Sequence, residues 1–209
     1  MWLADGTFSA APRQFLQLYT IHGYIQEHVY PFIIIFVTRR TQAIYTAVLT
    51  KLVDLAQEKF NITLQPRFIT TDFEQAAMNA FRELFPDASL SGCHFHLCHS
   101  IIRRCNDSGL KTKYRDNKEF GLNVRMLMAL AYLPVEDVAT GFELVNARPP
   151  SDVGPELFTY FDTTYVNGPV IRGSGATAVR RPPLFAPAVW NTHDRYIRDI
   201  LIISVQYTS

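Results

Sequence analysis

The sequence predicts an α/β protein whose mixed five-stranded sheet is followed by helices. Three observations carry this prediction: β-rich segments come first, a strand then leads into a helix twice, and later segments are mainly helical in periodicity. Of the 209 residues, 48% are hydrophobic and 19% are charged. Such a chain can bury a sizeable core and is neither disordered nor a coiled coil.

The first forty residues predict three antiparallel strands, because short β-branched or aromatic segments alternate with turn-forming stretches. The expected strands are residues 1–8, 15–22 and 29–37. The last of these contains the longest apolar run, nine residues that include Pro31. A membrane-spanning helix needs roughly 20 apolar residues, so no transmembrane segment is expected.

Helices and strands alternate in the next part of the chain. The expected helices are 44–60, a segment that begins at Asp72, and 95–105; the strands between them are 67–71 and 89–93. Thr41 is the expected N-cap of the first helix. A strand that leads into a helix is typical of a parallel βαβ unit.

The second half is expected to be mainly helical. Helical segments are predicted at 121–147, with a break at Pro134, and at 155–165. Residues 167–188 hold four prolines, three glycines and three arginines, which indicates a loop or linker. The apolar stretch 200–205 fits either a strand or the end of a helix.

Charge and cysteine content restrict the function. Twenty basic and nineteen acidic residues give a net charge of +1, whereas a protein that binds nucleic acid unaided usually has a clear basic excess. Three cysteines argue against a disulfide scaffold and for a reducing compartment. The N-terminus has neither the basic leader nor the long apolar stretch of a secretory signal.

Two aspartates are candidate metal ligands. Asp5 lies in the first expected strand and Asp72 at the carboxyl end of the fourth. If these strands are neighbours, the carboxylates meet at one edge of the sheet, and they could hold two hard divalent cations for phosphoryl transfer. Each aspartate also has a structural interpretation: Asp5-Gly6 is a hairpin-turn signal, and Asp72 with Gln75 fits a helix N-cap.

A cluster of cysteine and histidine side chains spans residues 93–99. Zinc is disfavoured there, because the one remaining cysteine, Cys105, falls on the same helix and a structural site usually joins two separated ligand pairs. Alternatively, Cys93 and His96 point at the carboxylate edge, where His96 contacts a phosphate or relays a proton. A buried Cys93 beside a hydrogen-bonded His96 is the purely structural alternative.

Basic residues follow this cluster. Arg103 and Arg104 lie near the proposed edge and are candidate DNA contacts. The basic residues that follow, up to Lys118, are diluted by acidic ones, and such a segment is usually a solvated face.

Taken together, these motifs resemble the transposase domain of Mutator-like elements. The resemblance rests on WLADGTF, QLYTIHG, ITTDFEQAAMNAFRELFP, LSGCHFHLCHSIIRR, ALAYLPVEDV and VWNTHDRYI, from Trp2 to about Tyr196. It implies a ribonuclease H-like fold with an all-helical insertion. It also implies cut-and-paste DNA transposition in the nucleus by a metal-dependent triad of two aspartates and a glutamate.

The resemblance assigns the first two catalytic acids to Asp5 and Asp72, with Mg²⁺ or Mn²⁺ as the cofactor, and the family's Cys-x-x-His motif to Cys93 and His96. The expected partners are transposon ends and target DNA, with a homo-oligomer left open and no membrane. The implied division is an incomplete ribonuclease H-like core at 1–106, a helical insertion at 107–166, and a Pro/Gly/Arg-rich loop with a divergent tail at 167–209.

The third acid departs from the family pattern. The catalytic glutamate is expected shortly after VWNTHDR, yet no glutamate follows Glu156, and neither Glu143 nor Glu156 lies in the matching motif. The chain is therefore expected to be truncated before the last core helix and to have no robust activity alone. The alternatives are a domesticated non-enzymatic nuclear protein that binds DNA or protein, and a zinc-dependent binding module.

Overall fold

The computed structural model describes residues 1–147 and 154–197, and the chain divides after Gly92. We call Met1–Gly92 unit 1 and the described residues from Cys93 onward unit 2. The domain boundaries expected from the sequence, after residues 106 and 166, stay predictions.

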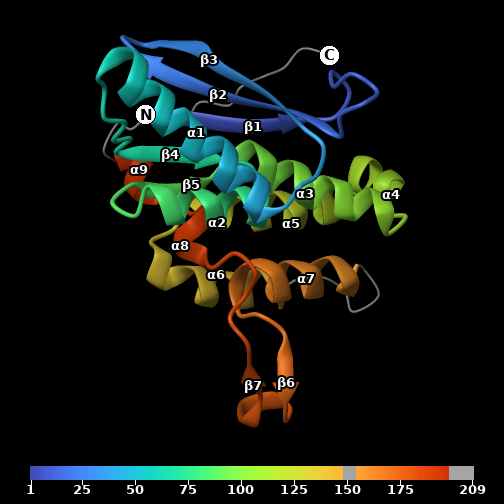
Figure 1. Ribbon diagram of the computed structural model, residues 1–209. Coiled ribbons are helices and arrows are strands. Elements are labelled where there is room, and N and C mark those ends of the chain that lie inside the picture. The colour runs from blue at the N-terminus through green and yellow to red at the C-terminus, as the bar shows by residue number, and fades with distance from the viewer. Residues whose placement is uncertain (148–153, 198–209) are drawn as a thin grey trace. The chain divides into compact units, whose positions relative to one another are not determined.

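Unit 1 contains a five-stranded mixed sheet in the order β3-β2-β1-β4-β5 (Figure 1). The strands are β1 Trp2–Thr7, β2 Gln17–Ile25, β3 His28–Val37, β4 Phe68–Thr71 and β5 Ser89–Gly92. The first three pair in antiparallel fashion, whereas β1 with β4 and β4 with β5 are parallel. The predicted mixed sheet is confirmed, and its first and fourth strands are neighbours, which is the condition for the two aspartates to meet.

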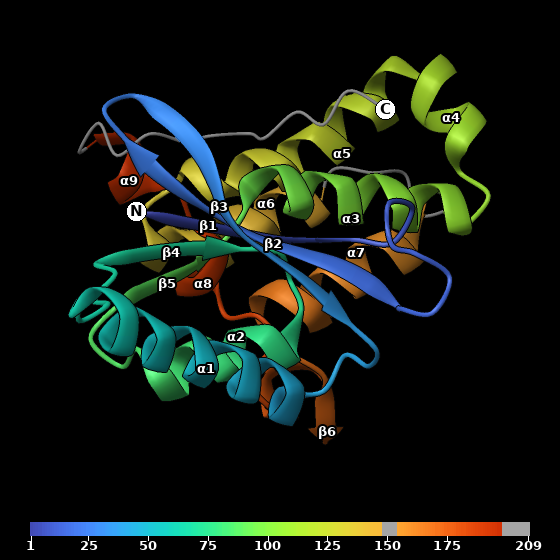
Figure 2. The same ribbon diagram turned by 45° about the horizontal axis from the view of Figure 1, so that its top comes forward.

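Two helices, α1 (Gln42–Phe60) and α2 (Gln75–Leu84), lie side by side on one face of this sheet (Figure 2). Thr41 caps α1 as predicted, because its side chain accepts a hydrogen bond from the amide of Ile44. The fully buried side chains between sheet and helices include Tyr19, Ile21, Tyr45, Leu49, Ile69 and Phe81. Burial of this apolar surface holds the unit together.

Unit 2 is mainly helical, as predicted. Its helices are α3 His94–Asp107, α4 Lys111–Asp116, α5 Lys118–Ala129, α6 Val138–Asn146, α7 Pro155–Phe161, α8 Pro187–Trp190 and α9 His193–Ile197. Pro134 interrupts the helical segment between α5 and α6, where only short 3₁₀ turns occur. None of the helices in the described ranges is long and apolar enough to cross a membrane.

Part of the loop prediction for 167–188 is wrong. This segment contains an antiparallel hairpin of β6 (Val170–Arg172) and β7 (Val179–Arg180), followed by α8. Strands of three and two residues are too short for a periodic hydrophobic pattern, so they leave no signal at the sequence level. The segment 200–205 lies outside the described residues.

Ile69 provides a test of the core of unit 1. Its side chain on β4 is fully buried, whereas Ile34 on β3 is 63% exposed. We expect Ile69→Ala to lower the free energy of unfolding by about 3 kcal/mol, through lost burial and a cavity. Ile34→Ala should cost less than about 1 kcal/mol. Urea unfolding measures both, and equal losses would contradict this sheet topology.

Candidate active site

Parallel pairing of β1 with β4 brings the two predicted aspartates together. Leu3 pairs with Thr70 and Ala4 with Thr71, so Asp5 and Asp72 occupy the next equivalent positions along the two strands. Neighbouring strands lie roughly 4.8 Å apart, and equivalent positions of a parallel pair share one face. The structure therefore puts both carboxylates side by side, with Asp5 inside β1 and Asp72 just after the carboxyl end of β4.

The structural interpretations of these aspartates are wrong. Asp5 and Gly6 lie inside β1, where they pair with Thr20 and Tyr19, and do not form a hairpin turn. Helix α2 begins at Gln75 rather than at Asp72, and the residue at its N-cap position, Glu74, makes no side-chain capping hydrogen bond.

The environment of Asp72 favours the protonated carboxyl. Asp72 is half-buried, and burial together with the charges of Glu74 and Asp5 raises its pKa from 3.8 to about 7. A hydrogen bond from Thr71 Oγ1 to Asp72 Oδ1, of 3.2 Å, and the charge of Arg40 act in the opposite direction. Asp5, Asp72 and Glu74 therefore bring negative charge together beside the carboxyl end of β4.

Glu74 is a part of this site that the sequence analysis missed. Its side chain is buried, and Oε2 lies 3.0 Å from Arg40 Nε and accepts a hydrogen bond from Gln17 Nε2 at 3.5 Å. Its other oxygen, Oε1, is buried and has no hydrogen-bond partner. The only signal in the sequence is an acid two residues after Asp72, which is too common to single out.

A set of buried hydroxyls supports the same edge. Tyr19 OH lies 3.2 Å from Thr71 Oγ1, and Tyr45 OH donates to Gln17 Oε1 at 3.0 Å. Burial, with the nearby carboxylates, raises the pKa of both tyrosines well above the usual value. Both phenols therefore stay protonated, and Tyr45 keeps the proton that it donates.

The donor set at this edge fits a hard divalent cation. Asp5 and Asp72 offer carboxylate oxygens, and a cation between them would offset the burial and the repulsion that together raise the pKa of Asp72. Mg²⁺ commonly uses one or two protein carboxylates and keeps several waters. Within residues 1–147 and 154–197, no group of three or more His, Cys, Asp or Glu side chains is arranged to hold a metal ion.

The predicted residues of unit 2 lie at the start of α3. Cys93 occupies its N-cap position, His96 lies in its first turn, and both side chains are half-buried. The His96 ring meets the Phe95 ring edge-on, with a centroid separation of 5.4 Å. That Cys93 and His96 face the two aspartates stays a prediction.

The zinc alternative gains no support from the remaining thiols. Cys98 Sγ lies 3.6 Å from His94 Nε2, which in turn is 3.4 Å from the carbonyl oxygen of Met128. Burial raises the pKa of the Cys98 thiol to about 11, which disfavours the thiolate that zinc requires.

The two candidate DNA contacts, Arg103 and Arg104, are both exposed on α3. The Arg104 guanidinium lies 5.4 Å from the centroid of the Tyr160 ring, a cation–π contact that fixes its direction. Nothing in their surroundings distinguishes them from other exposed arginines.

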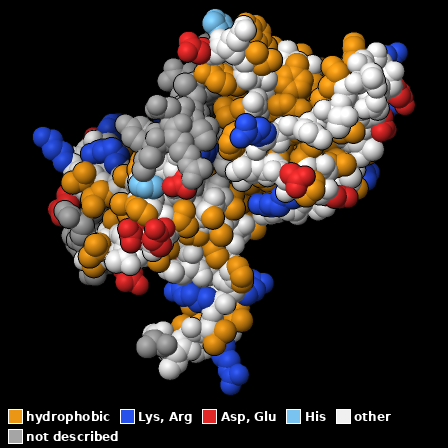
Figure 3. All heavy atoms as spheres, turned by 90° about the vertical axis from the view of Figure 1, so that its left-hand side faces the viewer, with side chains coloured by type: hydrophobic (Ala, Val, Ile, Leu, Met, Phe, Trp, Pro, Cys, Tyr) orange, Lys and Arg blue, Asp and Glu red, His pale blue; other side chains and the backbone are white. Residues whose placement is uncertain are grey.

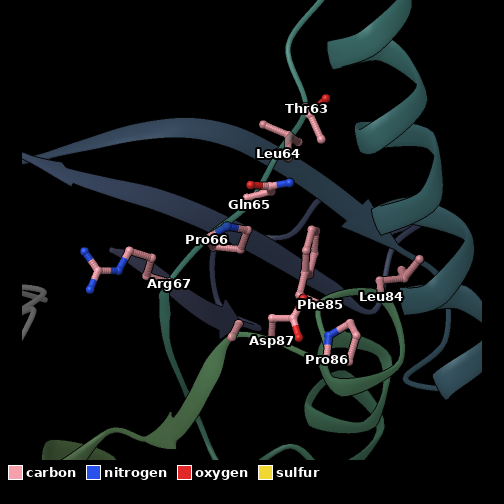
Figure 4. A pocket seen from close by; sticks show the side chains of 10 residues that line it. Thr63, Leu64, Gln65, Pro66, Arg67, Leu84, Phe85, Pro86 and Asp87 are labelled. Carbon is pink, nitrogen blue, oxygen red and sulfur yellow. The ribbon is translucent and has the colours of Figure 1, made fainter.

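Unit 1 also has an open pocket of about 420 Å³ at the amino ends of β4 and β5 (Figure 4). It lies between segment 63–67 and segment 84–88. Asp72 follows the opposite, carboxyl end of β4. The pocket is therefore separate from the aspartate pair.

Comparison with known families gives an independent result. Residues 1–100 match the family model of the MULE transposase domain. The resemblance to Mutator-like transposases is thus confirmed for the segment that contains Asp5, Asp72, Cys93 and His96. The motifs ALAYLPVEDV and VWNTHDRYI lie beyond the MULE match and stay predictions. No curated protein matches the chain significantly.

The raised pKa of Asp72 predicts a specific pH dependence. Between pH 4 and 7 the folded MULE segment holds a proton that the unfolded chain releases, so Asp72 lowers stability as the pH rises. Asp72→Asn should therefore raise the free energy of unfolding by about 4 kcal/mol at pH 8 in EDTA, and hardly at pH 4. Urea unfolding across this range measures the difference. The exposed Asp54→Asn is the control, and a gain independent of pH would contradict the assignment.

Proposed function

We propose that this chain carries the catalytic core of a Mutator-like DNA transposase of the DDE type, with a ribonuclease H-like sheet. The observation that supports this most directly is the adjacency of Asp5 and Asp72 at equivalent positions of β1 and β4, inside the segment that matches the MULE transposase domain. The strand order, three antiparallel strands followed by two parallel ones, also fits such a sheet.

In this proposal Asp5 and Asp72 hold divalent cations, Mg²⁺ or Mn²⁺. When bound, the ions supply activation of the attacking oxygen and stabilisation of the leaving oxygen in phosphoryl transfer. Thr71 orients Asp72 through the hydrogen bond to Oδ1. Arg40 pairs with Glu74, and its positive charge partly offsets the negative charge of the carboxylates at the site.

A DDE site needs a third acid beside Asp5 and Asp72. No glutamate follows Glu156 in the sequence, and the glutamate of unit 1 that acts on Asp72, Glu74, has its Oε2 engaged by Arg40. With two acids instead of three, a second cation would be weakly held. We infer that the polypeptide alone has no robust strand-transfer activity. Its DNA substrate, transposon ends and target, makes the nucleus its expected location.

Cation binding tests the aspartate pair directly. We expect Mn²⁺, followed by its electron paramagnetic resonance signal, to bind wild-type protein, and Asp5→Asn and Asp72→Asn each to weaken binding at least about tenfold. Asp54→Asn, which removes an exposed carboxylate of α1, should leave the affinity unchanged. Unaltered binding in both site variants would reject the proposed centre.

A nicking assay tests the expected lack of activity. Wild-type protein with double-stranded DNA and Mg²⁺ or Mn²⁺ should give no robust cleavage, because in this proposal Asp5 and Asp72 act without a third acid. Gel electrophoresis of a supercoiled plasmid detects a single nick. Cleavage that Asp72→Asn abolishes would show that two acids suffice, and the inference of inactivity would then be wrong.

A further inference from the structure

The β6–β7 hairpin of unit 2 projects from the helices around α6 and α7 (Figure 1). All five residues of its two strands are exposed, and the strands pair only with each other. Val170, Ile171 and Val179 are 47%, 58% and 51% exposed. An isolated two-stranded hairpin is marginally stable in water, so this one depends on its anchored base and leaves its length available to a partner.

The base of the hairpin is firmly anchored. The Arg180 guanidinium lies 2.8 Å from Asp162 Oδ2 and donates to the Gly168 carbonyl at 2.6 Å. The amide of Arg181 donates to the Pro169 carbonyl at 3.0 Å. Beyond β7, the chain returns to the fully buried Trp190, whose indole N–H donates to the carbonyls of Tyr165 and Phe185. The arm is thus held at its base rather than along its length.

The charge of this segment has one sign. No acidic residue occurs from Thr163 to His193, whereas Arg172, Arg180 and Arg181 fall within it. Arg180 is paired with Asp162, and Arg172 and Arg181 are exposed. At the bottom of Figure 3, basic side chains lie beside hydrophobic ones on the projecting hairpin. Such a surface complements a polyanion rather than an ordinary apolar protein interface.

The tip of the hairpin is narrow. Residues 173–177 are Gly-Ser-Gly-Ala-Thr, and Gly173 and Gly175 have φ values of +75° and +54°. A Cβ at Gly173 would collide with the carbonyl oxygen of Thr177, so the turn closes only with glycine there. A two-stranded ribbon with small side chains at its tip fits the major groove of DNA, which is about 12 Å wide.

We propose that the β6–β7 hairpin is a DNA-binding arm. Arg172 and Arg181 contact phosphates of duplex DNA, the glycine-rich tip enters the groove, and the exposed aliphatic side chains pack against sugars and thymine methyl groups. This assignment rests on the proposed function for its ligand, DNA, but not on the chemistry at Asp5 and Asp72.

The test is fluorescence anisotropy of the full chain with a labelled 30-base-pair duplex in EDTA, at several salt concentrations. Arg172→Ala/Arg181→Ala should weaken binding about tenfold at 150 mM salt and reduce the slope of log K against log salt by about 2. Arg172→Lys/Arg181→Lys should retain most of the affinity. The control, Lys111→Ala/Lys118→Ala, removes the same charge from exposed positions of α4 and α5 and should change binding less than about twofold.

Several outcomes would contradict the proposal that the β6–β7 hairpin binds DNA. They are absence of DNA binding by the wild type, equal losses in the hairpin and control variants, and a hairpin variant that binds like the wild type. A change of oligomeric state in the hairpin variant, seen by light scattering, would instead indicate an interface between copies. Because the assay is run in EDTA, it does not depend on a cation at Asp5 and Asp72, so failure of the cation site and failure of the arm are distinguishable.

Discussion

Burial and mutual repulsion of carboxylates beside the carboxyl end of β4 are the constraint on which the site in unit 1 depends. Asp5 and Glu74 both raise the pKa of Asp72, which is itself half-buried. Carboxylates in such a position are unfavourable unless protons, cations or donors compensate them. Thr71 and Arg40 provide part of that compensation, and a divalent cation would provide the rest. The charged form of Asp72 therefore lowers the stability of the folded protein, and strongly shifted pKa values of this kind are typical of functional sites.

Arg40 connects the segments that carry these acids. It pairs with Glu74 before α2, and its guanidinium lies 5.1 Å from the centroid of the Phe8 ring, just after β1. Gln17 reaches Glu74 from β2 across Gly6, where a Cβ would collide with the Gln17 amide. The glycine after Asp5 is thus explained by this close approach rather than by a turn.

Elements with strong periodicity were predictable from the sequence, and features made by contacts between distant residues were not. Thr41 and the apolar spacing of α1 are local signals, and the strand–helix–strand order predicts the parallel pairing of β4 with β5, whereas the adjacency of β1 and β4 had no local signal. The predicted start of α2 is too early because Asp72 and Gln75 mimic a capping box, whereas the helix begins at Gln75, after Glu74 in an extended conformation. The contacts of Glu74 with Arg40 and Gln17 join three separate segments of the chain, so no local sequence pattern could predict them.

The net charge of +1 argues against strong unaided DNA binding only if charge is spread evenly. At physiological ionic strength, charges more than about 8 Å apart are largely screened, so the local distribution decides what a surface attracts. All acidic residues of this chain lie outside residues 163–193, and this segment contains three arginines. A nearly neutral protein can therefore hold a cation at one place and a phosphate backbone at another. Because the acidic aspartate site and the basic segment 163–193 are different parts of the chain, binding of a cation and binding of a phosphate backbone are compatible.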